Sequence, residues 1–150
     1  MWNIGSDEAT NVIVNGIDPE VFKQIVGAEV YEMYIIFASD DYIASNPETV
    51  QKMVTAIAKA IKWFNDESRT AEEIAEAVMP LFEGKEDEVN YSVGIIMDQG
   101  VMTEYGYHTE EGFAAANVLA KLCGLIEEDV PAEGIYNETF LDNAWAEIGK

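Results

Sequence analysis

The chain has 150 residues, of which 49% are hydrophobic, and this is enough apolar material for one compact domain with a core. It carries 29 acidic residues against 8 basic ones, a formal net charge of −21. This charge argues against binding to nucleic acids or anionic membrane surfaces, because both would repel it. We interpret the acidity as a solubility feature rather than as a cation-binding surface.

Two features bear on the compartment. No stretch reaches the roughly 18–20 apolar residues of a membrane span, and residues 1–8 lack the basic start and apolar run of a signal peptide. Taken alone, this predicts a cytoplasmic protein.

The single cysteine, Cys123, excludes an intramolecular disulfide, and its apolar neighbours at 118–122 predict a buried, inert thiol.

The first predicted element, residues 7–15, is ambiguous. Its β-branched residues at 12–14 would suit a strand. Ser6 is a good helix start and Gly16 a good helix stop, so we favour a short helix.

A second helix and a strand follow. Asp18 and Pro19 open a short helix that is expected to end at Gly27. Residues 33–38 are a continuous apolar run with β-branched and aromatic members, which is typical of a strand buried on both faces.

A long helix is predicted to begin at Pro47, with Asn46 as its cap, and to run for about 19 residues. Its inward stripe recurs at helical spacing and consists of Val50, Met53, Val54, Ile57, Ile61 and Phe64. Thr70 and Glu73 form a capping box that starts the next helix. That helix is expected to turn Ile74, Val78 and Phe82 inward and to stop at Gly84.

Three more helices complete the chain. One is predicted over residues 86–99, and another begins after Thr109 and ends at Gly124. The inward face of the latter is expected to be Phe113, Ala116, Ala120 and Cys123. The last helix starts near Asn137 and presents Phe140, Leu141, Ala144, Trp145 and Ile148.

Signatures of catalysis or cofactor binding were not found. The sequence has no glycine-rich phosphate loop, no Cys-x-x-Cys and no Gly-x-Ser-x-Gly, so we expect no cofactor and no enzyme activity. We interpret the single histidine, His108, as a loop or helix-cap residue. The acidic groups at 40–41 and 127–129 lack calcium-loop spacing, and solvated helix flanks and turns explain them better than a metal site.

A candidate ligand site lies just before the predicted strand. Tyr31, Glu32 and Tyr34 combine aromatic faces with one carboxylate, as small-molecule pockets do. An ordinary strand entry, with tyrosines packed at the core edge, accounts for them equally well. Both interpretations stay open.

Several segments together resemble a known family. Residues 37–50 read FASDDYIASNPETV and continue at 56–66 as AIAKAIKWFND. Near the end, 122–126 read LCGLI and 136–144 read YNETFLDNA. With residues 6–18, their order and spacing resemble the C-terminal part of nitrate/sulfonate/taurine-type solute-binding proteins of bacterial ABC importers.

This resemblance implies a helix-rich α/β architecture, part of the two-lobed type II periplasmic-binding fold. Residues 1–32 would be the end of lobe two and the return crossing, and 33–150 the C-terminal part of lobe one. The expected partners are a small solute (a sulfonate, nitrate, a pyrimidine or similar) and the permease subunits of the importer. The family's N-terminal strands and signal peptide are missing, so we expect a truncated chain whose full-length protein works outside the cytoplasm.

The family resemblance also shapes the site and its alternatives. Ser6, Tyr31, Glu32 and Tyr34 are the expected ligand contacts, and the last three suit an amine-bearing or aromatic solute. The only arginine, Arg69, lies too far along the chain to be an obvious anion clamp. An unpaired strand edge at 33–38 would favour self-association. The alternatives are a stand-alone helical interaction module and, with less support, an enzyme like those that make the thiamine pyrimidine.

Overall fold

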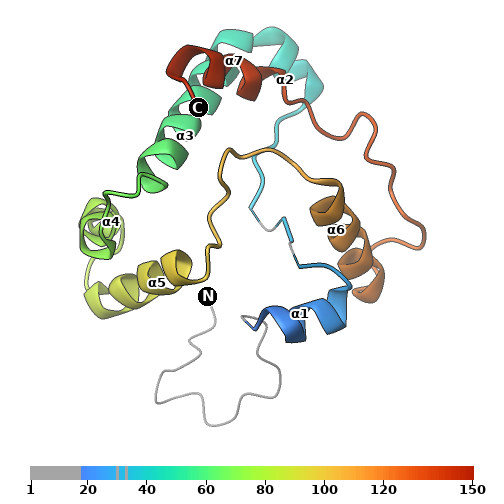
Figure 1. Cartoon of the computed structure of the whole chain (residues 1–150). Helices are drawn as coiled ribbons and strands as arrows, with labels where there is room; N and C mark the ends of the chain where they lie inside the picture. Colours follow the sequence, from blue (N-terminus) through green and yellow to red (C-terminus); the bar gives the residue numbers. More distant parts are fainter. Residues whose placement is uncertain (1–17, 30, 33) are drawn as a thin grey trace. The chain divides into compact units, whose positions relative to one another are not determined.

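The computed structural model describes residues 18–29, 31–32 and 34–150, and the helices of these ranges form two units (Figure 1). Unit 1 comprises Met1–Ile36 and His108–Tyr136, and unit 2 comprises Phe37–Tyr107 and Asn137–Lys150. The predicted helix at 7–15 and Ser6 lie outside the described residues. The division of the chain between two lobes stays a prediction.

Unit 1 contains helix α1 (Pro19–Val26), which begins and ends where the sequence predicts. The Asp18 carboxylate accepts the Glu20 N–H at 3.0 Å, and Gly27 closes the helix at a φ of 79°, where a side chain would be strained. Val26 then packs with Ala28 against helix α6 (Glu110–Leu122).

Helix α6 begins at its predicted cap but turns a different face inward. The Thr109 hydroxyl accepts the Gly112 N–H at 3.0 Å. The buried α6 residues are Gly112 and Ala115, so the predicted inward face of Phe113, Ala116, Ala120 and Cys123 is wrong by about one position. The reason is that α1 packs on the Ala115 side of the helix.

The prediction that Cys123, which follows α6, is buried is also wrong. Cys123 is exposed, not buried, because it is the C-cap residue, beyond the part of the helix that α1 covers. Its apolar neighbours in sequence therefore did not predict burial.

Unit 2 begins with helix α2 (Asp40–Ser45), which the sequence analysis did not predict. Ser39 caps it by accepting the Tyr42 N–H at 3.2 Å. Asp40 and Asp41 occupy its first turn, in agreement with their interpretation as helix flanks.

Helix α3 (Pro47–Phe64) follows directly. Its start is confirmed, but Asn46 does not cap it, because the Asn46 amide instead donates to the Tyr42 carbonyl at 3.2 Å and ends α2. Most of the predicted stripe faces inward, whereas Met53 is 56% exposed.

The first core of unit 2 joins α3 to helix α7 (Thr139–Ile148), and Figure 1 shows the two helices side by side. Its buried residues are Ala58, Ile61, Ala144 and Trp145. The Trp145 indole N–H donates to the Tyr105 carbonyl at 2.9 Å. The predicted last helix and its apolar face are thus confirmed.

The second core of unit 2 joins helices α4 (Ala71–Val78) and α5 (Glu86–Asp98). Its buried residues are Ile74, Ala75, Val89 and Val93. The α-helix ends at Val78, because the short 3₁₀ helix η1 (Met79–Leu81) contains Pro80, and Phe82 is 47% exposed instead of inward.

The predicted strand is the largest difference between the sequence-based prediction and the observed fold. Residues 34–38 form no strand, and Tyr34 and Phe37 are 89% and 87% exposed; Met33 lies outside the described residues. Residues 18–29, 31–32 and 34–150 contain no strand to pair with, and an unpaired strand is not stable in water. The helix-rich class is confirmed, the strands of an α/β class are not seen, and the edge on which predicted self-association depended is absent there.

Candidate functional site

The best-defined polar centre of unit 1 lies at the N-terminus of α6. The Glu32 Oε1 atom accepts the Thr109 N–H at 2.7 Å, and Glu32 Oε2 lies 2.6 Å from His108 Nδ1. Both side chains are largely covered, with 27% of His108 and 20% of Glu32 exposed. Glu32 therefore joins the segment after α1 to the helix start, where a carboxylate is favoured by the helix dipole.

Gly112 makes room for this carboxylate. A Cβ atom at position 112 would lie 2.8 Å from Glu32 Cγ and 2.8 Å from Thr109 Oγ1. Real Cβ atoms do not approach other atoms so closely. Glycine is thus required here for close approach rather than for an unusual φ.

A second polar link joins the same two segments. The Glu111 carboxylate accepts the Glu29 N–H at 2.9 Å, and the Glu29 carboxylate pairs with the Lys23 ammonium. The hydrogen bond between the two charged side chains raises the pKa of Lys23 and lowers the pKa of Glu29.

Aromatic rings support the His108 side of the centre. The His108 ring stacks on Tyr136 with ring centres 4.3 Å apart, and Phe113 meets Tyr136 edge-on at 5.6 Å. His108 immediately precedes the α6 cap, which confirms its interpretation as a cap-region residue.

A groove of about 410 Å³ runs along the neighbouring face of α6. Its apolar lining comes from Phe113, Ala114, Val118, Val130 and Ala132, and its charged lining from Glu110, Lys121 and Asp129. This volume lies within the range of small-molecule sites.

The far wall of the groove is fixed to the helix. The Asn117 amide nitrogen donates to the Val130 carbonyl at 3.0 Å, and Asn117 Oδ1 accepts the Val130 N–H at 2.9 Å. The Lys121 ammonium pairs with Asp129 at 2.6 Å. These three contacts attach residues 129–130 to α6 along one side of the groove.

Unit 1 is strongly acidic. Residues 18–36 contain four acidic side chains and 108–136 contain six, ten in all against two lysines. Each lysine has a carboxylate partner, Glu29 for Lys23 and Asp129 for Lys121. Side chains of this unit therefore favour a cation over an anion.

The predicted site residues are only partly brought together. Tyr31 packs on Phe22 with ring centres 6.2 Å apart, whereas the Tyr34 side chain is almost fully exposed. Glu32 belongs to the polar centre at the start of α6, and Ser6 lies outside the described residues. Their role as ligand contacts stays a prediction.

Sequence reasoning missed the Glu32–His108 contact and the groove. The two residues of the contact are 76 positions apart, and no local pattern relates them. The spacing of Glu110, Phe113, Asn117 and Lys121 does mark one face of a helix. That spacing is the only sequence signal for the groove.

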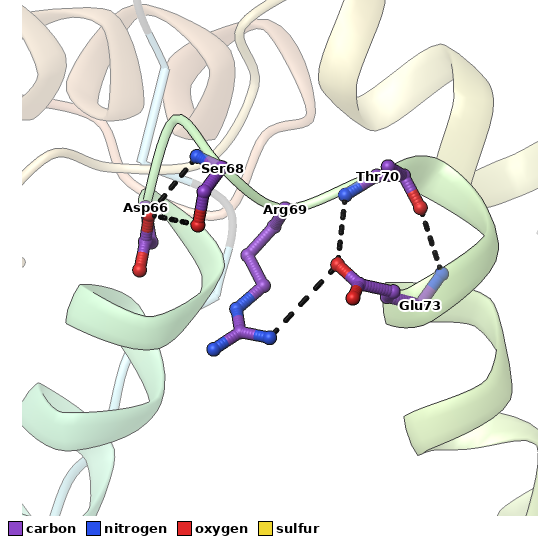
Figure 2. A network of polar contacts seen from close by, with 5 residues as sticks. All are labelled: Asp66, Ser68, Arg69, Thr70 and Glu73. Carbon is purple, nitrogen blue, oxygen red and sulfur yellow. Dashed lines mark hydrogen bonds and ion pairs between the residues drawn. The ribbon is translucent and has the colours of Figure 1, made fainter.

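Arg69, the only arginine, belongs to a separate polar network in unit 2 (Figure 2). Its guanidinium lies 3.9 Å from Glu73 Oε2 and 5.0 Å from the centre of the Trp63 ring. The Thr70–Glu73 capping box is confirmed, with hydrogen bonds of 3.3 and 3.2 Å (Figure 2). Arg69 thus stabilises a helix start.

Asp66 completes that network. The Ser68 hydroxyl and backbone N–H donate to its carboxylate at 2.7 and 2.9 Å (Figure 2). These two hydrogen bonds, the hydroxyl's above all, lower the pKa of Asp66.

The described ranges hold no group of three or more metal-ligating side chains. Nor does any helix in them combine the length and apolar character that crossing a bilayer requires.

Comparison with known proteins gives one family. The NMT1/THI5 like family model matches residues 8–71, a segment that contains α1, Glu32, α2 and α3. No curated protein and no solved structure shows significant similarity to this chain. The chain therefore carries an NMT1/THI5-like segment at residues 8–71, which confirms for that segment the predicted resemblance to nitrate/sulfonate/taurine-type solute-binding proteins.

Proposed function

We propose that this chain is the solute-binding component of an ABC importer and works outside the cytoplasm. It captures a small organic or anionic solute and delivers it to the permease without changing it chemically. The observation that carries this proposal is the NMT1/THI5-like match over residues 8–71. A groove of small-molecule size in unit 1 adds support.

A second candidate is an enzyme related to thiamine synthesis, because the matched family includes such enzymes as well as binding proteins. One contact in the structure favours this candidate. The carboxylate of Glu32 lies 2.6 Å from His108 Nδ1, and a carboxylate-oriented imidazole is a common general base. Glu32 also accepts the Thr109 N–H, however, and this second bond suits a structural cap at least as well.

A thermal-shift screen of the 150-residue chain tests the first proposal. The panel contains sulfonates, nitrate, pyrimidines, riboflavin and organic amines. A solute present at about 100 times its Kd stabilises the folded chain by about 2.7 kcal/mol, which raises the Tm by a few degrees. Failure of every solute to raise the Tm would contradict the proposal.

Mass spectrometry then separates the two candidates. A bound solute is incubated with the chain, released and weighed. A binding protein returns the solute unchanged, whereas the enzyme converts it, and conversion that disappears in His108→Gln would favour the second candidate.

A further inference from the structure

The charge of the α6 groove points to a class of ligand. Of its three charged lining residues, Lys121 is neutralised by Asp129 at 2.6 Å. Glu110 has no ion-pair partner within the described ranges. The lining as a whole thus carries one net negative charge.

The rest of the described part of unit 1 does not offset this charge. Its other lysine, Lys23, is held by Glu29, and His108 is held by Glu32. An anionic solute would meet no uncompensated ammonium, whereas a cationic solute would meet the free carboxylate of Glu110.

The apolar lining defines the other half of the ligand. Phe113, Ala114, Val118 and Val130 present hydrocarbon surface beside that carboxylate. The Phe113 ring is held edge-on by Tyr136, and a fixed aromatic ring also attracts an ammonium group through its π face.

We propose that the α6 groove binds a small organic cation, an ammonium group attached to an apolar or aromatic body. This inference rests on the proposed function and narrows its solute to amines, away from sulfonates and nitrate. Glu110 binds the ammonium group, and the apolar lining covers the body. Asp129 sets the charge of the groove by neutralising Lys121.

Isothermal titration with matched probes tests this specificity. The probes are 2-phenylethylamine, 2-phenylethanol and phenylacetate, which have similar bodies and a positive, neutral or negative end. We expect the amine to bind most tightly and phenylacetate least. A wild-type chain that prefers phenylacetate would overturn the inference but leave solute binding intact.

Two neighbouring glutamates give a matched pair of variants. Glu110→Gln removes the groove carboxylate and should weaken amine binding roughly two- to fivefold, as expected for one exposed ion pair. Glu111→Gln changes the next residue, which binds the Glu29 N–H and does not line the groove, and should leave the affinity unchanged. Equal effects of the two variants would overturn the assignment to this groove.

A charge inversion makes the test stricter. The double variant Glu110→Gln/Asp129→Asn frees Lys121 and turns the net charge of the lining from −1 to +1. Its preference should reverse, so that phenylacetate binds better than the amine. If no probe and no solute of the wider screen binds the wild-type chain, the proposed function fails together with this inference.

Discussion

The two units are stabilised by different means. In unit 2 the α3–α7 core is tightly closed, with Ala58 and Ala144 at 0% exposure and Trp145 at 3%. In unit 1 the buried core residues are small, namely Val26, Ala28 and Ala115. Hydrogen bonds across long sequence separations add to its order, including those of Glu32 and Glu111 to backbone N–H groups.

Each unit is therefore sensitive to a different kind of substitution. Burial of large apolar side chains contributes several kcal/mol per residue, whereas a hydrogen bond at the surface contributes about 1 kcal/mol. Unit 2 is therefore expected to be the more stable part. Unit 1, which holds the groove, has polar groups whose arrangement a ligand or a single substitution can change.

Trp145→Ala should give the largest effect, because it removes the largest buried side chain of the α3–α7 core. The indole packs edge-on against Tyr105 at 5.4 Å and donates to its carbonyl. Removing it is expected to lower the free energy of unfolding by about 3–5 kcal/mol. Urea unfolding followed by circular dichroism measures this loss.

Tyr34→Ala is the control for Trp145→Ala, since Tyr34 is an aromatic residue at 89% exposure. Its effect should stay within about 0.5 kcal/mol. Similar losses in the two variants would contradict the core assigned to unit 2.

Gly112→Ala should have the next largest effect and should act on unit 1. The added Cβ would lie 2.8 Å from Glu32 Cγ, so the carboxylate must leave the start of α6. We expect a loss of about 1–3 kcal/mol, typical of overpacking, and a changed NMR signal of the His108 ring.

Gly94→Ala provides a matched control in the middle of α5. A Cβ there would meet no atom within 4 Å, so this variant should gain about 0.5–1 kcal/mol from helix propensity. Opposite signs for the two glycine variants would support the Glu32 contact, and equal signs would contradict it.

Helix starts were the part of the fold most accessible to sequence analysis. Asp18, Thr70 and Thr109 were each predicted to stand at the start of a helix, and each accepts a backbone N–H two or three residues later. Such contacts are local, so the sequence contains both partners within one turn. Asn46 failed because two helices meet there, and it ends the first instead of capping the second.

Contacts that depend on packing partners were not accessible. Residues 34–38 have the composition of a buried strand, yet composition does not supply a neighbouring strand. The inward face of α6 was misplaced because the position of α1 decides it. For the same reason, Glu32 was found as a candidate but its partner His108 was not.

The two threonine caps extend the comparison between units. Thr70→Ala removes a cap in unit 2 and Thr109→Ala removes one in unit 1, and each should cost about 1 kcal/mol. Hydrogen exchange should show faster exchange confined to the first turn of α4 or of α6. Serine at either position keeps the hydroxyl and should restore slow exchange; spread of the effect to the other unit would contradict separate units.

Ser68→Ala should give the smallest effect, a change of one pKa. The Ser68 hydroxyl is the main cause of the lowered pKa of Asp66, so its loss should move that pKa part of the way back toward the ordinary value. A lowered carboxyl pKa stabilises the fold at pH values above the ordinary pKa of aspartate. This contribution is lost as the pH falls through the lowered pKa. Carboxyl-carbon NMR titration of Asp66 in acid measures the shift. Ser68→Thr should titrate like the wild type, because threonine keeps both the hydroxyl and the backbone N–H that donate to Asp66. In Ser68→Ala only the backbone N–H remains, and it holds the pKa of Asp66 only part of the way down.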